Sequence, residues 1–270
     1  MKVIVSHDID HLHVSEHFTD LIIPKFIVRS KIEFLMGRIS FSELSFRLCE
    51  LFENKWNRID ELMEFNLSKS IPSTFFVGVN NGLGLNYSLE KATSVINKIQ
   101  SKGFDIGVHG IAYDDYDSIK QEFDVFSSIV GHKKFGIRMH YLRNNQNTME
   151  YLMRAGYLFD ASLLEFNPTY KINSISEFPV HIMDTLMINK NKSWQVNNWQ
   201  QALDDSKRLI DSALISNFDY FSILFHDRYF SDGFVTWKKW YIKLVEYLIQ
   251  NDFKFVNYKM ALREKGLPYE

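Results

Sequence analysis

Short apolar runs alternate with amphipathic helical patterns along most of the 270-residue chain. A short apolar run between turn residues is typical of a buried strand, and apolar residues three and four apart are typical of a helix. Strands that alternate with helices form parallel sheets, because each helix returns the chain to the end at which the next strand begins. The expected strands are residues 2–6, 74–79, 105–108, 135–138, 157–159, 178–181, 221–225 and 254–256.

The segments between these strands contain the expected helices. The clearest patterns cover residues 89–99, where Ser88 is the expected N-cap and Gly103 the stop, then 116–130 and 237–248. Seven or eight strands with crossover helices favour a (β/α)7-8 barrel that occupies residues 1–270 as one domain. An open, doubly wound α/β sheet is the alternative, because spacing alone does not close a barrel.

A long connection separates the first two expected strands. Residues 13–73 exceed the length of an ordinary loop, and they contain helical patterns at 41–53 and 57–66. We expect a helical insertion beside the functional site. It could form a lid or a substrate wall, or it could only cover the barrel.

The composition limits the classes of function. Apolar residues make up 46% of the chain, which is enough for a large core, and the net charge of −2 without a basic block argues against nucleic acid as a partner. The lone Cys49 excludes an intramolecular disulfide and a thiolate zinc site. The first residues turn acidic too early for a signal peptide, and no stretch approaches the ~20 apolar residues that span a bilayer. These features predict a soluble cytoplasmic protein.

Polar side chains stand at the ends of four expected strands. They are Asp8 and Asp10 after the first strand, His109 after the third, Arg138 and His140 at the end of the fourth, and His226 after the seventh. Because the carboxyl ends of parallel strands lie on one side of an α/β fold, we expect these side chains to meet at one site. Arg138 could instead pair with a structural carboxylate such as Asp160.

This set of side chains suits one kind of chemistry. A carboxylate and an imidazole from different strands can hold Zn²⁺ or a similar ion, which polarises a carbonyl and lowers the pKa of its water. A second carboxylate can accept the proton of that water, and an imidazole can protonate the leaving group. An arginine can orient the carboxylate base. The sequence therefore predicts metal-assisted hydrolysis of an amide or ester.

At these residues the chain resembles the polysaccharide deacetylase (NodB-homology) superfamily, and more narrowly its divergent WbmS-like branch from bacterial surface-polysaccharide genes. The resemblance implies a distorted (β/α) barrel and a divalent metal, usually zinc. The motifs that carry it are, in order, SHDIDH, STFFVG, GFDIGVHG, FGIRMHYLR, AGYLFDASL, FPVHIMD and ILFHDRYF.

The resemblance also implies roles for individual residues. By position these are Asp8 as the catalytic base, Asp10 and His109 as metal ligands, Arg138 as the brace of the base, Asp184 as the aspartate of the fourth motif, and His226 as the general acid. The oxyanion would form against the metal and a backbone N–H near Tyr141.

The chain departs from the family pattern at one ligand. The second metal histidine of the family lies four residues after the first, where this chain has Tyr113. Asp114 is the first candidate for the missing metal ligand, and His7, His11 or His140 could also fill the place. The expected substrate-binding residues are Tyr113, His140, Tyr141 and Trp194.

The functional hypothesis is a metal-dependent deacetylase that acts on an N- or O-acetylated sugar in bacterial surface-polysaccharide biosynthesis. Its partners would be the acetylated glycan and, by peripheral contact, membrane-linked glycan machinery. Tyr113 motivates the alternative, a catalytically degenerate barrel that binds a glycan or a partner enzyme. A third option is another metal hydrolase, acting on a phosphoester or an amide; the absence of a glycine-rich anion loop counts against phosphate.

Overall fold

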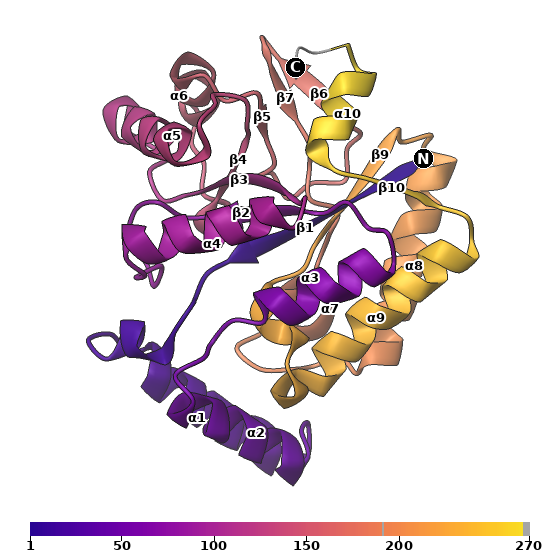
Figure 1. Ribbon diagram of the computed structural model, residues 1–270. Helices are drawn as coiled ribbons and strands as arrows, with labels where there is room; N and C mark the ends of the chain where they lie inside the picture. Colours follow the sequence, from indigo (N-terminus) through magenta and orange to yellow (C-terminus); the bar gives the residue numbers. More distant parts are fainter. Residues whose placement is uncertain (191, 267–270) are drawn as a thin grey trace.

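A curled, mostly parallel sheet forms the centre of the fold (Figure 1). The computed structural model describes residues 1–190 and 192–266. Along the sheet the strand order is β6-β7-β5-β4-β3-β2-β1-β9-β8, with β10 also paired to β1, and only β6 runs antiparallel to its neighbour. The strands are β1 (Lys2–Ile9), β2 (Thr74–Val77), β3 (Asp105–Gly110), β4 (Ile137–Met139), β5 (Phe159–Asp160), β6 (Tyr170–Ile172), β7 (Ile175–Glu177), β8 (Ile182–Met183), β9 (Tyr220–Leu224) and β10 (Lys254–Val256).

The two ends of this sheet meet through one short segment. Strands β7 and β8 are separated by only four residues, 178–181, which the sequence predicts as a strand. The amide of Phe178 donates to the Asp160 carbonyl of β5 at 2.9 Å, and the amide of His181 donates to the Ser222 carbonyl of β9 at 3.1 Å. The segment thus links β5, near one end of the sheet, to β9, near the other end, and the sheet is curled into a distorted barrel rather than open and doubly wound.

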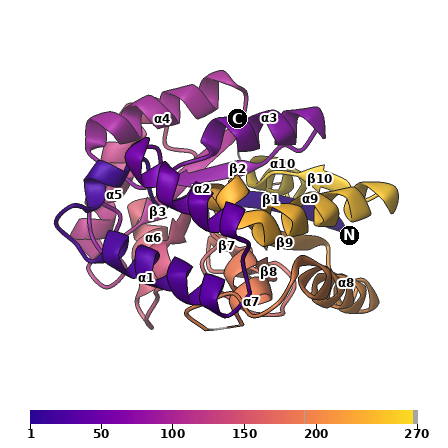
Figure 2. The ribbon, with the colours of Figure 1, turned by 90° about the horizontal axis from the view of Figure 1, so that it is seen from below.

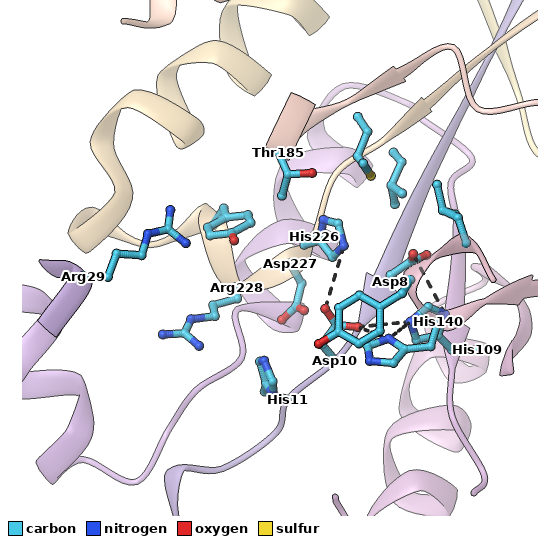
Figure 3. Close-up of a pocket in the computed structure, with 15 residues that line it drawn as sticks. Asp8, Asp10, His11, Arg29, His109, His140, Thr185, His226, Asp227 and Arg228 are labelled. Carbon is cyan, nitrogen blue, oxygen red and sulfur yellow. Dashed lines mark hydrogen bonds and ion pairs between the residues drawn. The ribbon is translucent and has the colours of Figure 1, made fainter. Parts of the chain in front are cut away.

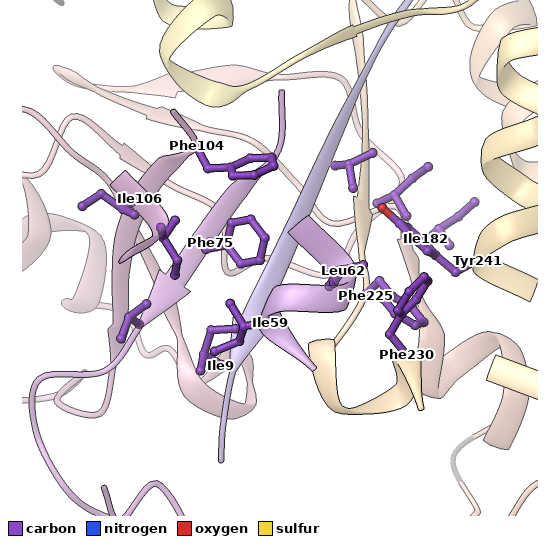
Figure 4. Close-up of a cluster of buried hydrophobic side chains, with 14 of the residues drawn as sticks. Ile9, Ile59, Leu62, Phe75, Phe104, Ile106, Ile182, Phe225, Phe230 and Tyr241 are labelled. Atoms are coloured by element: carbon purple, nitrogen blue, oxygen red, sulfur yellow. The ribbon is translucent and has the colours of Figure 1, made fainter. Parts of the chain in front are cut away.

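Alternation along β1 divides the core into two layers. Ile4 packs inside the curled sheet with Phe76, Phe159 and Tyr258. Neighbouring positions such as Val5 face outward, into the larger apolar layer between the sheet and the helices (Figure 4). Successive strand residues point to opposite faces, so Ser6 and Asp8 follow Ile4 on the inner face and rise toward the carboxyl end of the strand.

Helices surround the sheet, and the predicted helical segments form. Ser88 caps α4 by accepting a bond from the Lys91 amide, and Gly103 follows the helix with a positive φ of 83°, as expected for its stop. No helix in the described residues is long and apolar enough to cross a membrane. The helices outside the insertion are α4 (Leu89–Ser101), α5 (Tyr116–Val130), α6 (Thr148–Ala155), α7 (Asp184–Asn189), α8 (Trp199–Ile215), α9 (Val235–Gln250) and α10 (Tyr258–Glu264).

The insertion after the first strand is helical, as predicted. It contains α1 (Ile22–Leu35), α2 (Phe41–Phe52) and α3 (Ile59–Ser68), and α1 and α2 lie beside each other beyond the carboxyl end of β1 (Figures 1 and 2). The buried Arg47 of α2 donates to Glu33 of α1 and to the Gly233 carbonyl, each at 2.5 Å. This arginine therefore fixes the α1–α2 pair against the chain that follows β9.

Candidate metal centre and cavity

A cavity of about 470 Å³ opens at the carboxyl ends of the strands (Figure 3). Its lining includes Asp8, Asp10, His109, His140 and His226, which come from β1, from β3 and from the chain just after β4 and β9. The residues that the sequence places at strand ends are therefore neighbours in space.

Three donor atoms of this group converge on one point. The Asp10 Oδ1 lies 3.1 Å from His109 Nε2 and 3.3 Å from His140 Nδ1. The two imidazole nitrogens are 3.0 Å apart. Among the described residues, Asp10, His109 and His140 form the group of histidine and acidic side chains that lie close enough together to hold a metal ion.

Hydrogen bonds to backbone carbonyls determine which nitrogen of each imidazole carries the hydrogen. The His109 Nδ1 lies 3.1 Å from the Arg138 carbonyl oxygen, and the His140 Nε2 lies 3.2 Å from that of Leu83. A carbonyl only accepts hydrogen bonds, so in each neutral ring this nitrogen carries the proton and the other nitrogen presents a lone pair to the common point.

This donor set fits a divalent cation. Two imidazole lone pairs 3.0 Å apart repel each other unless a proton or cation lies between them. Two neutral imidazoles with one carboxylate are a common ligand set for catalytic Zn²⁺, which keeps a further position open. The rest of the coordination sphere would face the cavity, since all three residues line it.

Asp8 lies beside this group with a buried arginine behind it. One Asp8 carboxylate oxygen is 3.2 Å from Arg138 Nη1, and the other is 4.0 Å from His109 Nδ1. The remaining donors of Arg138 bond Ser6 Oγ at 2.8 Å, the Tyr258 hydroxyl at 2.7 Å and the Ala161 carbonyl at 2.7 Å. These bonds fix the guanidinium inside the barrel, and its ion pair is with Asp8 rather than Asp160.

His226 occupies another wall of the cavity and is held by Asp184. Its Nδ1 is 3.0 Å from Asp184 Oδ1, and its backbone amide donates to Asp184 Oδ2 at 2.7 Å. Its Nε2 lies 3.8 Å from Asp10 Oδ2 and so faces the metal-ligating group. Burial alone would lower the pKa of His226, but the adjacent carboxylate of Asp184, followed by Asp10 and Asp8, raises it well above its usual value.

Tyr141 lines the cavity next to His140. The ring centroids of the two residues are 4.1 Å apart, and the Tyr141 hydroxyl donates to the Leu83 carbonyl at 3.3 Å. Tyr141 and Leu142 have φ angles of 59° and 53°, a left-handed conformation that non-glycine residues seldom adopt. Such strain is often kept at functional sites; here it turns the chain sharply just after His140.

Three other expected site residues lie outside this cavity. Asp114 is exposed just before α5 and lies outside the group of Asp10, His109 and His140 that could hold a metal ion. The guanidinium carbon of Arg143 lies over the Tyr113 ring, 4.6 Å from the ring centroid. Trp194 lines a separate apolar groove along α1, with residues such as Leu21 and Val28.

The remaining histidine candidates also have other contacts. His7 faces the outer layer, with Nδ1 2.8 Å from the Phe225 carbonyl and Nε2 2.9 Å from Asn66 Nδ2. His11 lines the cavity and packs against the rings of His17 and Trp56, and burial lowers its pKa to about 3. Both imidazoles are therefore neutral at physiological pH.

The sequence analysis assigns no role to several residues that line the cavity. Arg228 and Asp227 directly follow His226, and that position was the available signal. Arg29 gave no signal, because it belongs to the insertion, whose orientation a sequence pattern does not define.

Comparison with known proteins supports the fold. No protein-family model matches the sequence, and no curated protein matches it. Among solved structures, a protein designated a polysaccharide deacetylase from Mycobacterium smegmatis aligns with a TM-score of 0.66 and 15% identity over 98% of this chain and 91% of its own. A protein with the same designation from Pseudomonas aeruginosa PAO1 aligns with a TM-score of 0.63 and 14% identity, over 100% of this chain and 92% of its own. The PuuE allantoinase aligns with a TM-score of 0.63 and 14% identity, over 97% of this chain and 88% of its own. The chain thus has the fold of the polysaccharide deacetylases, as the sequence motifs indicate.

Proposed function

We propose that this protein is a metal-dependent hydrolase that removes an acetyl group from an N- or O-acetylated sugar in bacterial surface-polysaccharide biosynthesis. The observation that carries the proposal is the convergence of Asp10, His109 and His140, with the Asp8–Arg138 pair and the His226–Asp184 pair beside it. The shared fold with polysaccharide deacetylases supports the choice of an acetylated sugar.

Asp10, His109 and His140 would hold the cation, with Zn²⁺ as the first expectation. When bound, the ion would supply a Lewis acid for the acetyl carbonyl and acidify water. The backbone carbonyls of Arg138 and Leu83 keep the two imidazoles oriented toward that place.

Asp8 would act as the base that accepts a proton from the attacking water. Its pair with the fixed Arg138 keeps the carboxylate oriented. His226 would donate a proton from Nε2 to the leaving nitrogen or oxygen of the sugar. Asp184 accepts from Nδ1, which favours the protonated imidazole that a general acid requires.

The degenerate-barrel hypothesis rests on Tyr113 at the position of a family ligand. His140 supplies a third donor from a different strand end, which weighs against the loss of the metal. The third hypothesis, hydrolysis of a non-sugar amide, remains a rival because an allantoinase has a similar fold.

The peripheral contact with membrane-linked glycan machinery also remains a proposal. Its support is a set of exposed apolar side chains on α1 and α2, among them Val28, Leu35 and Phe52. Cosedimentation with anionic phospholipid vesicles tests it, and a protein that stays in the supernatant at low salt would exclude the contact.

Acetate release from N- and O-acetylated sugars, measured before and after loading with Zn²⁺, tests the enzymatic proposal. Asp8→Asn should abolish turnover and leave the bound metal near the wild-type level, because Asp8 is not in the metal-ligating group. Turnover that survives this substitution contradicts the role given to Asp8. A wild-type chain that binds no metal and releases no acetate favours the degenerate barrel.

A further inference from the structure

Two arginines form a second polar end of the same cavity. Arg29 comes from α1 of the insertion, and Arg228 comes from the turn after β9. In Figure 3 both guanidinium groups lie on the side away from His109 and His140, with His226 between the two ends. The mechanism proposed above uses neither arginine.

Both guanidinium groups contain buried nitrogens without hydrogen-bond partners. Among the described residues, nothing accepts from Nε and Nη2 of Arg228 or from Nη2 of Arg29. The guanidinium carbon of Arg228 instead lies over aromatic rings, 3.8 Å from the centroid of Trp56 and 4.4 Å from that of Phe26. Buried polar groups in folded proteins nearly always have a partner, so unpaired donors on two side chains that line the same cavity point to a missing ligand.

The charges around these arginines do not balance. Glu33 accepts from both Arg29, at 3.0 Å, and Arg47, at 2.5 Å. Glu50, the carboxylate that favours the charged form of Arg228, is itself bonded to Arg58 at 2.5 Å. Burial lowers the pKa of Arg228 to about 10, so it stays cationic at neutral pH.

The acidic residues of the cavity have other partners. Asp8 pairs with Arg138, and Asp10 contacts the two metal-ligating histidines. Asp227 accepts from the Arg58 backbone amide at 2.8 Å, and burial raises its pKa to about 7. The positive excess at Arg29 and Arg228 is therefore left for a ligand to neutralise.

We propose that Arg29 and Arg228 bind an anionic group of the substrate itself, a phosphate or a carboxylate attached to the acetylated sugar. The proposal deepens the function given above and rests on it: the acetyl group would lie at the Asp10 end while the anion occupies the arginine end. Guanidinium groups match the planar or tetrahedral oxygen edges of carboxylates and phosphates. Sugars that lack an acidic group would then be poor substrates.

Calorimetry on the zinc-loaded full-length chain tests this with three probes: N-acetylglucosamine, its 1-phosphate and the corresponding N-acetylated uronic acid. Charge-assisted hydrogen bonds predict that at least one anionic probe binds about tenfold or more tightly than the neutral sugar. A preference for the phosphate or for the uronic acid identifies the source of the anion. Equal affinities for all three probes overturn the proposal.

Substitutions of the arginines show whether the anionic group binds at these arginines or at the metal. In Arg228→Gln the preference should fall to about one, whereas Arg208→Gln, an exposed arginine on α8, should retain it. An undiminished preference in Arg228→Gln shows that the anion binds elsewhere, for instance at the metal, and overturns the proposal. Arg29→Gln, at the partly exposed face of α1, gives a second variant if Arg228→Gln does not fold, and its preference should also fall.

Binding and turnover together separate this proposal from the proposed function. An arginine-dependent preference without acetate release would leave the anion site intact and contradict the deacetylase. Acetate release with equal kcat/KM for neutral and anionic sugars would leave the deacetylase intact and contradict the anion site.

Discussion

His109 and His140 approach each other through ring nitrogens 3.0 Å apart, and in each ring the other nitrogen is bonded to a backbone carbonyl. The two lone pairs face each other because these hydrogen bonds to the backbone fix both tautomers. Since the outer bonds orient both rings, little free energy should be spent on rearranging them when an ion binds.

His140→Gln should weaken Zn²⁺ affinity more than the 10- to 100-fold that loss of an outer contact typically causes. The reason is that His140 supplies one of three converging donor atoms. Competitive titration against a chromogenic chelator measures the affinity.

Asp114→Asn is the matched variant, because Asp114 is the candidate that the family spacing suggests. Its carboxylate is exposed and lies outside the group, so the affinity should stay within about twofold of wild type. A large loss in Asp114→Asn with little loss in His140→Gln would reverse the assignment.

Asp184→Asn should shift the alkaline limb of the kcat–pH profile to lower pH. Burial favours neutral His226, and the Asp184 carboxylate is the largest influence that raises its pKa. A general acid must be protonated to act, so a lower pKa means that activity is lost at a lower pH as the pH rises. The kcat profile of both proteins between pH 5 and 10 measures the shift. An unchanged alkaline limb would show that His226 does not act as the acid.

Arg138→Met should destabilise the fold by about 3–5 kcal/mol, since it leaves the Asp8 charge buried without its partner. Ser6 and Tyr258 also lose their bonds to the guanidinium. Urea unfolding measures the loss, with exposed Arg154→Met as a control that should change stability by less than about 0.5 kcal/mol. In Asp8→Asn/Arg138→Met the buried charge is absent, so part of the lost stability should return. A double variant as unstable as the sum of the two single variants would rule out this explanation.

The sequence predicts the barrel well because its strands are buried on both faces. Residues 74–77 and 220–224 are buried at every position and are mostly apolar, a pattern that the sequence shows. The segment at 178–181, which the sequence predicts as a strand, forms no regular strand: it bonds β5 at one end and β9 at the other. Sequence patterns do not show such a link, because it depends on residues that are distant along the chain.

The site is partly predictable for a similar reason. Strand ends identify Asp8, Asp10, His109 and His226, since parallel strands present their carboxyl ends together. Spacing alone leaves the third ligand open between Asp114 and His140, and the sharp turn at Tyr141 and Leu142 that follows His140 has no sequence signature. Arg29 enters the cavity only because Arg47 fixes the α1–α2 pair, which is a tertiary effect.

A buried pair of carboxyl groups outside the candidate metal-binding group should make stability depend on pH. Asp160 of β5 lies opposite Glu177 of β7 in the parallel register, and Glu177 Oε2 has no hydrogen-bond partner among the described residues. Burial, and then the charge of Asp160, raises the pKa of Glu177 well above its ordinary value of 4.5. The native state therefore keeps this proton at pH values where the unfolded chain has lost it.

Because the unfolded state binds fewer protons above pH 4.5, the stabilisation from this group should decline as the pH rises from there. Glu177→Gln keeps a neutral side chain of the same shape at every pH. It should match wild type near pH 5 and exceed its melting temperature by several degrees at pH 8. Exposed Glu150→Gln should show no such difference. Equal melting temperatures of Glu177→Gln and wild type at both pH values would mean that Glu177 is ionised in the native protein.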